Sequence, residues 1–124
     1  MSLEAAQVYD VPRSTVQAIS IDWGENTSGT ETGVLDAGDT VASAVVAVDG
    51  KPSGAADPTF GSVVVNSTSV VINGRTCSAG EAVAVTMTLA SDQAYGSYRL
   101  KVTATTANGF VLPRYVRFRV TEPQ

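Results

Sequence analysis

The clearest alternation of hydrophobic and polar side chains lies near the end of the chain. Residues 98–105 carry an apolar side chain at every second position, and residues 116–120 do so again. A side-chain period of two is typical of strands that bury one face. Asn108-Gly109 lies between the two segments, and this pair is a strong signal for a hairpin turn. The pattern therefore predicts a hairpin around which the rest of the chain is organised.

The two alternating segments also constrain the turn that joins them. A strict two-residue loop would pair Lys101 with Val116 and would mix the buried and exposed faces. The buried sets match only if the loop has an odd length or if one strand contains a bulge. Gly109 in a left-handed conformation, or the Leu112-Pro113 step, would supply this correction.

Earlier parts of the chain contain further segments that predict strands. These segments are residues 16–23, 39–48, 62–65, 69–72 and 82–89. The segment 39–48 is nearly apolar on both faces, which favours a central position in a sheet. Trp23 follows Ile19 and Ile21 on one face of its strand, so we expect it to lie in the core.

Turn signals separate these segments every ~8–12 residues, and no helical periodicity lasts longer than about two turns. The sequence therefore predicts an all-β fold, and its most specific form is an immunoglobulin-like β-sandwich of about seven strands. Tyr95 or Tyr98 is the candidate for the tyrosine corner of such a fold. We expect residues 1–15 to form an extended lead-in and residues 16–121 to form a single sandwich domain.

Composition and charge narrow the class of protein. Hydrophobic residues make up 44% of the chain and charged residues 16%, with a net charge of -4. The acidic balance argues against nucleic-acid binding, and no apolar run reaches the ~18 residues that span a membrane. The N-terminus shows no signal-peptide pattern, and Cys77 is the single cysteine. We therefore expect folding in a reducing cytoplasm.

The chain offers little catalytic or metal-binding chemistry. It has no histidine, which removes Ser-His-Asp and Cys-His machinery and imidazole zinc sites, and Cys77 lacks a base. Oxygen ligands for calcium cluster around residues 24–38, namely Asp22, Glu25, Asn26, Asp36 and Asp39. Their spacing matches no calcium-loop motif, and such residues are also common in turns. We predict no catalytic residue, no cofactor and no metal site.

Charge is distributed unevenly along the chain. Eight of the twelve acidic residues lie in residues 1–49, whereas five of the eight basic residues lie in residues 99–119. One face of the hairpin carries Arg99, Lys101, Arg117 and Arg119, and like charges opposed across strands cost roughly 0.2–1 kcal/mol per pair.

This repulsion can be offset in two ways. In the first explanation, acids on a neighbouring strand or simple solvation offset it. In the second, an acidic surface on another subunit does so. An identical subunit would present Asp36, Asp39 or Asp49. Tyr115 shares the basic face and would serve as an aromatic anchor. The second explanation predicts an interface made of Arg99, Lys101, Tyr115, Arg117 and Arg119.

Several motifs occur in a fixed order over residues 16–121. They are Ile21-Asp22-Trp23, Leu35 followed by Ala37-Gly38-Asp39-Thr40-Val41-Ala42-Ser43, Gly96-Ser97-Tyr98 with Val102, the turn Thr105-Thr106-Ala107-Asn108-Gly109, and Arg117-Phe118-Arg119-Val120. In this order they resemble a family of small virion proteins from tailed bacteriophages and prophages, described as fibre–tail adaptors or neck and tail structural proteins. The chain departs from that family at Val45-Val46-Ala47, where a tryptophan is expected, and at Asp92-Gln93-Ala94, where a Gly-Gly pair is expected.

The resemblance implies a non-enzymatic virion structural or adaptor module in the tail, neck or fibre-attachment region. Its partners would be other virion proteins, with a homo-oligomer as an option and with no role for nucleic acid or membrane. It would fold in the cytoplasm of the bacterial host and end in the virion. The alternative is a bacterial surface immunoglobulin-like or adhesin module that binds protein or glycan.

Overall fold

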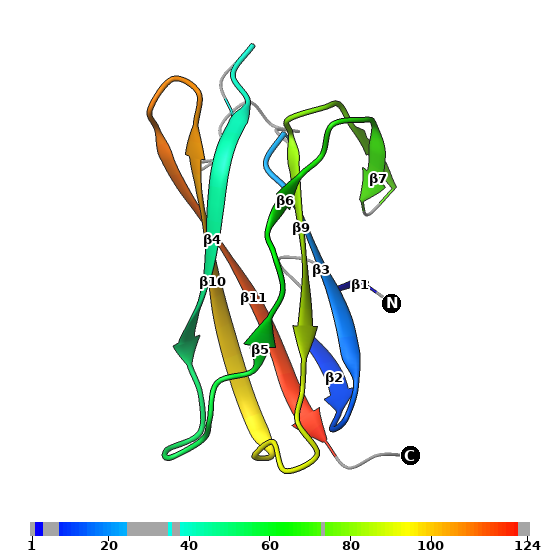
Figure 1. Cartoon of the computed structure of the whole chain (residues 1–124), viewed down its shortest axis with the longest axis vertical. Helices are drawn as coiled ribbons and strands as arrows, with labels where there is room; N and C mark the ends of the chain where they lie inside the picture. Colours follow the sequence, from blue (N-terminus) through cyan, green and yellow to red (C-terminus); the bar gives the residue numbers. More distant parts are fainter. Residues whose placement is uncertain (1, 4–7, 25–34, 36–37, 73, 122–124) are drawn as a thin grey trace.

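The computed structural model describes residues 2–3, 8–24, 35, 38–72 and 74–121 of the 124-residue chain. In this part of the chain the regular secondary structure is entirely strand, with eleven strands in all. Two sheets lie face to face around the core, and a small third sheet lies to one side (Figure 1). The predicted all-β sandwich is confirmed. The predicted count of about seven strands misses several that are only two or three residues long.

The first sheet is built on two long antiparallel strands. In spatial order its strands are β1 (Ser2–Leu3), β3 (Val16–Asp22), β9 (Ala82–Thr88) and β5 (Thr59–Phe60), and β6 (Val64–Val65) also pairs with β9. β1 runs parallel to β3, and the other pairs are antiparallel. β7 (Val70–Ile72) and β8 (Arg75–Cys77) form the third sheet.

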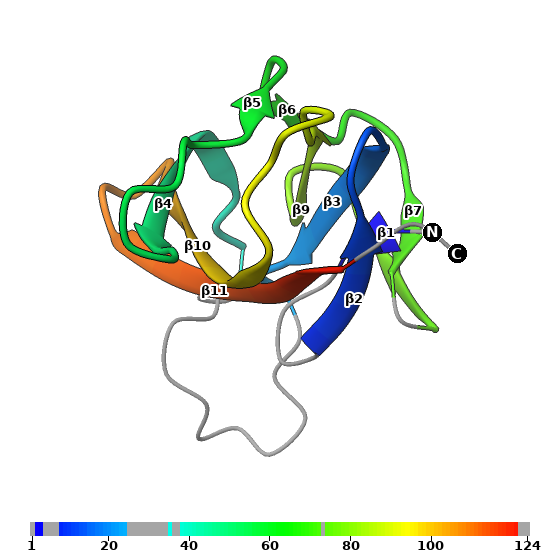
Figure 2. The same cartoon turned by 90° about the horizontal axis from the view of Figure 1, so that it is seen from below.

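The second sheet contains the predicted hairpin at its centre. In spatial order its strands are β2 (Val8–Pro12), β11 (Val111–Thr121), β10 (Gly96–Thr106) and β4 (Val41–Gly50). β2 runs parallel to β11, whereas β10 is antiparallel to both of its neighbours. Figure 2 shows this sheet as a separate layer from β3 and β9.

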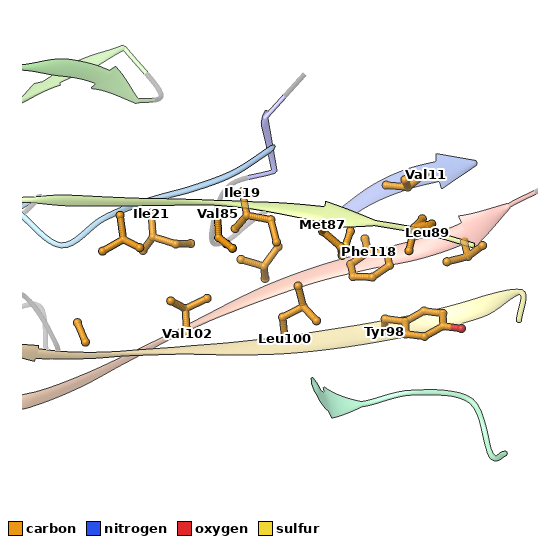
Figure 3. Close-up of a cluster of buried hydrophobic side chains, with 14 of the residues drawn as sticks. Val11, Ile19, Ile21, Val85, Met87, Leu89, Tyr98, Leu100, Val102 and Phe118 are labelled. Atoms are coloured by element: carbon orange, nitrogen blue, oxygen red, sulfur yellow. The ribbon is translucent and has the colours of Figure 1, made fainter. Parts of the chain in front are cut away.

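The core fills the space between the two sheets (Figure 3). Ile19 of β3 and Met87 of β9 point toward Leu100 and Phe118 of the opposite sheet, and all four side chains are buried. Trp23, directly after β3, has no exposed surface. Its predicted place in the core is confirmed.

The β10–β11 hairpin has the register that the alternation requires. Leu100 lies opposite Val116, so buried residues face buried residues across the ladder. The Thr106 amide donates to the Phe110 carbonyl oxygen at 2.8 Å, which closes a three-residue loop, and Gly109 has a φ of 89°. A turn followed by a left-handed glycine is a common three-residue hairpin connection. The predicted odd-length loop with a left-handed Gly109 is confirmed.

A buried tyrosine fixes the start of β10. The Tyr98 hydroxyl donates to the Ala94 carbonyl oxygen at 2.7 Å and accepts from Gln93 Nε2 at 3.2 Å. A hydroxyl that bonds back to the backbone just upstream is the arrangement of a tyrosine corner. Of the two candidates Tyr98 occupies this position, whereas Tyr95 is exposed.

The expected central position of the segment 39–48 is wrong. Within the described part of the chain β4 pairs with β10 alone and lies at the end of the second sheet. The strand is apolar on both faces, yet its outward residues Ser43, Val45 and Ala47 are exposed, and Val45 retains 65% of its surface. An apolar pattern on both faces does not fix the place of a strand in the sheet, because Val and Ala side chains are found both buried and exposed.

The sandwich also begins earlier in the chain than expected. Residues 8–12 are extended, as predicted for the lead-in, but they pair with β11 as β2. Val11 has no exposed surface and belongs to the core. The boundary at residue 16 therefore corresponds to a change of sheet, from β2 to β3, within one sandwich.

Candidate protein interface

The outward face of the second sheet carries the five predicted interface residues. Arg99 and Lys101 lie on β10, and the other three lie on β11. The register places Arg99 opposite Arg117 and Lys101 opposite Tyr115, with Arg119 one pair further along. Residues separated by up to 20 positions in sequence are thus brought onto one continuous surface, which we call the basic face.

Two arginines of the basic face are neutralised by acids from the flanking strands. Arg99 Nη2 lies 2.7 Å from Asp49 Oδ2, where β4 ends, and Arg119 Nη2 lies 2.9 Å from Asp10 Oδ1 of β2. These pairs match the first explanation for the like charges, which placed acids on neighbouring strands. Exposed pairs of this kind contribute only ~0–1 kcal/mol to stability. They chiefly remove the repulsion inside the sheet.

The other two cations are sheet neighbours of an aromatic residue. Tyr115 is half-buried, with Lys101 as its cross-strand partner and Arg117 two positions along β11. The Arg99 guanidinium carbon lies 5.5 Å from the Tyr115 ring centroid. Within the described residues neither Lys101 nor Arg117 has an ion-pair partner. The centre of the face therefore combines uncompensated positive charge with an aromatic surface.

Toward the hairpin turn the same face becomes uncharged. Thr103 lies between Val45 and Pro113, and the next row places Thr105 between Ser43 and Val111. Val111 keeps 62% of its surface exposed. The exposure of Val45 could not be predicted from β4 itself, because this strand is apolar on both faces and its pattern does not show which face points outward. Its pairing with Thr103 of β10 places Val45 on the outward face.

Of the five residues considered as calcium ligands, the structure describes Asp22 and Asp39, and these two have separate partners. Asp22 binds Arg75 Nη1 through both oxygens, at 2.7 and 2.9 Å, and also accepts the Gly24 amide. Asp39 is buried elsewhere, and Glu25, Asn26 and Asp36 lie outside the described residues. Among the residues described, no three His, Cys, Asp or Glu side chains are placed to hold a metal ion.

Arg75 holds the β7–β8 hairpin against the first sheet. Besides Asp22 it contacts Glu81, with Nη2 3.2 Å from Oε1, and Glu81 in turn accepts the Ser78 amide at 2.8 Å. Cys77 is buried beside this cluster. Its burial raises the pKa of the thiol to about 11, and the neighbouring Asp22 carboxylate adds to this rise. The protonated thiol fits a structural role better than a nucleophilic one.

Asp39 connects the start of β4 to the β10–β11 turn. Its Oδ1 accepts the Thr40 amide at 2.9 Å and the Asn108 amide at 3.2 Å. Burial raises the pKa of this carboxyl, but hydrogen bonds from the Thr106 side chain and the two amides outweigh burial, so the pKa is lowered overall. Asp39 therefore holds the start of β4 to the turn by hydrogen bonds. Because it is buried, it cannot contact an identical subunit, which corrects the expectation from the sequence.

Comparisons with protein-family models, curated proteins and solved structures find no match. Across the described residues, no helix is long and apolar enough to cross a membrane.

Proposed function

We propose that the chain is a non-catalytic structural or adaptor module of a tailed-phage virion. In this proposal its basic face and the adjoining uncharged rows contact another virion protein in the tail, neck or fibre-attachment region. The single observation that carries the interaction role is the grouping of Lys101, Tyr115 and Arg117 at the centre of one sheet face. Interface centres favour aromatic and arginine side chains, and charge around them sets orientation and encounter rate.

The motifs behind the phage resemblance occupy defined structural positions. Ile21 and Trp23 lie in the core, Tyr98 forms the corner, and residues 105–109 include the hairpin turn. These motifs therefore bear on the fold. The tyrosine corner and the parallel pairing of β2 with the last strand support an immunoglobulin-like form of the sandwich, which we include in the proposal. The virion role rests on the order of the motifs.

The basic face requires a partner with exposed carboxylates. Of the three acids considered for an identical subunit, Asp39 is buried and Asp49 already binds Arg99, whereas Asp36 lies outside the described residues. We therefore propose a different virion protein as the partner, with carboxylates that complement Lys101 and Arg117. Such contacts should weaken as salt rises, since exposed charges are screened within ~8–10 Å at ordinary ionic strength.

The test uses particles purified from the bacterial strain that carries the gene. We expect the purified tailed virions to contain peptides of this chain, at a fixed ratio to the tail proteins. Arg117→Glu should reduce incorporation at least tenfold, whereas Lys51→Glu, which makes the same charge change at another exposed position, should not. Each variant is first shown to fold by its melting temperature.

Two results would overturn the proposal. Absence of the chain from virions, together with its recovery on the bacterial surface, would support the adhesin alternative. Normal incorporation of folded Arg117→Glu would show that the basic face is only solvated.

A further inference from the structure

A second interaction surface lies at the edge of the second sheet. β4 is ten residues long and pairs with β10 along one side only. β6 of the other sheet approaches β4 without pairing with it (Figure 1). Among the described residues, the other side of β4 is therefore an unpaired strand edge over residues 42–48, whereas the Val41 amide donates to the Gly80 carbonyl oxygen at 2.8 Å. This edge does not overlap the Lys101–Tyr115–Arg117 group.

The hairpin register identifies the backbone groups at this edge. Thr106 bonds across to Phe110 of the hairpin, so even-numbered residues of β10 bond β11 and odd-numbered ones bond β4. Thr103 lies opposite Val45, which makes the odd-numbered residues of β4 the ones that bond β10. The amide and carbonyl groups of Ala44 and Val46 must then point away from β10.

The edge lacks the features that usually prevent strand pairing. Natural edge strands carry lysine, proline or bulges along their length. Residues 41–48 read Val-Ala-Ser-Ala-Val-Val-Ala-Val, without a charge, a proline or a glycine. The irregularities in the β4–β10 ladder occur only near its two ends, between Arg99 and Leu100 and between Thr105 and Thr106.

We propose that β4 pairs antiparallel with β4 of a second copy, around a two-fold axis at Val45. The two four-stranded sheets would then form one continuous sheet across the dimer. Ala44 would exchange backbone hydrogen bonds with the partner's Val46, using the groups that point outward. Val45 would lie directly opposite the partner's Val45 in a non-hydrogen-bonded pair, where side chains approach most closely.

Charge and parity make a second copy the fitting occupant. The pairing keeps odd-numbered side chains on one face and even-numbered ones on the other, so both inward faces stay buried. Asp49 is the one charged residue of β4, four positions from the axis, and it is already paired with Arg99. At ~3.3 Å per residue the two Asp49 would lie about 26 Å apart, beyond the screening length. The uncharged edge provides no ion-pair partner for a charged strand, whereas β4 of a second copy is equally uncharged over residues 41–48.

The association should be weak, because strand-edge pairing buries little side-chain area. We expect a transient dimer, as for interfaces smaller than ~1,200 Å². A high local concentration of the chain at an assembly site would raise the fraction of dimer by mass action. The inference does not depend on the virion role, which uses the sheet face.

Sedimentation velocity over a range of concentrations tests the pairing. Val45→Lys would place two ammonium groups opposite each other at the axis and should abolish the dimer. Val111→Lys is the matched control, since Val111 is also exposed on the same face (62% against 65% for Val45) but lies on β11. It should leave the dimer unchanged. A wild-type chain that stays monomeric at the highest soluble concentration would overturn the proposal, as would equal dimerisation of both variants.

Cross-linking tests the register directly. A non-hydrogen-bonded antiparallel pair has Cα atoms about 4.5 Å apart, within the range that a disulfide spans. Val45→Cys should therefore form a covalent dimer under oxygen with copper–phenanthroline, as two thiols lose two protons and two electrons. Ala47→Cys, also exposed but two positions from the axis, should cross-link at least tenfold more slowly. Equal rates for the two variants would mean random collision and would refute the register. The native Cys77 is buried and serves as an internal unreactive thiol.

Discussion

Tyr98 and Phe118 stack across the β10–β11 ladder, with ring centroids 5.1 Å apart and ring planes 2° from parallel. The pair lies beside the tyrosine corner, so one side chain joins the two strands of the hairpin and also holds the loop before β10. Both rings are buried, which places this joint inside the core.

Tyr98→Phe should keep the ring stacking on Phe118 but lose the hydroxyl hydrogen bonds of the tyrosine corner. The Ala94 carbonyl and the Gln93 side chain would each lose a hydrogen-bond partner, and such a loss costs about 1–3 kcal/mol for a buried group. Urea denaturation should show a lower midpoint with an unchanged slope. Tyr95→Phe removes the same hydroxyl from an exposed ring and should have little effect. Equal stability of Tyr98→Phe and the wild type would contradict the corner.

Trp23→Ala should destabilise the fold by ~3–5 kcal/mol, because it leaves a large cavity in the core. Against a typical total of ~5–15 kcal/mol, we expect little folded protein to survive mild heating. Trp23→Phe should cost less, since it keeps most of the ring volume and removes an indole N–H that has no hydrogen-bond partner among the described residues. Thermal melting of both variants ranks them, and the reverse order would argue against a packing role.

The Cys77 thiol should resist modification at pH 8. Its pKa of about 11 keeps it protonated there, and burial limits access. A disulfide reagent such as DTNB should react slowly with the native protein and completely in guanidinium. Because the folded pKa lies above the ordinary value of 9.0, this group favours the folded state below about pH 9 and loses that contribution as pH rises toward 11. Rapid labelling of the folded protein would disprove the burial.

Asp39 should make stability depend on pH in the acid range. Its folded pKa lies below the ordinary value of 3.8, so the ionised form favours the folded state above that value. The contribution is lost as pH falls through the folded pKa. Asp39→Asn should therefore lower the melting temperature at pH 7, and the difference from wild type should shrink as the pH falls below 3.8 and through the folded pKa. Asp57→Asn, at an exposed carboxylate, is the control.

The hairpin could be predicted in detail because its determinants are local. Alternation sets the faces of β10 and β11, and matching those faces requires the odd loop that Gly109 supplies. Trp23 could be placed for the same reason, since Ile19 and Ile21 define the inward face of its strand.

Relationships between distant segments could not be predicted in the same way. Nothing local links Asp22 to Arg75, 53 residues apart, because their contact depends on where the β7–β8 hairpin packs. The edge position of β4 depends on strand order, and alternation contains no information about order. For the basic face, the sequence could group the cations but could not assign Asp10 and Asp49 to two of them.

The parallel pairing of β2 with β11 has a mechanical consequence. The register runs from Val8 opposite Arg117 to Pro12 opposite Thr121. Tension applied at Val8 and at Thr121 would pull the two strands past each other along their length. The hydrogen bonds between them lie across that direction, so they would share the load in shear and would have to break together. A domain tied in this way should yield at a higher force than one whose end strands can be peeled apart bond by bond.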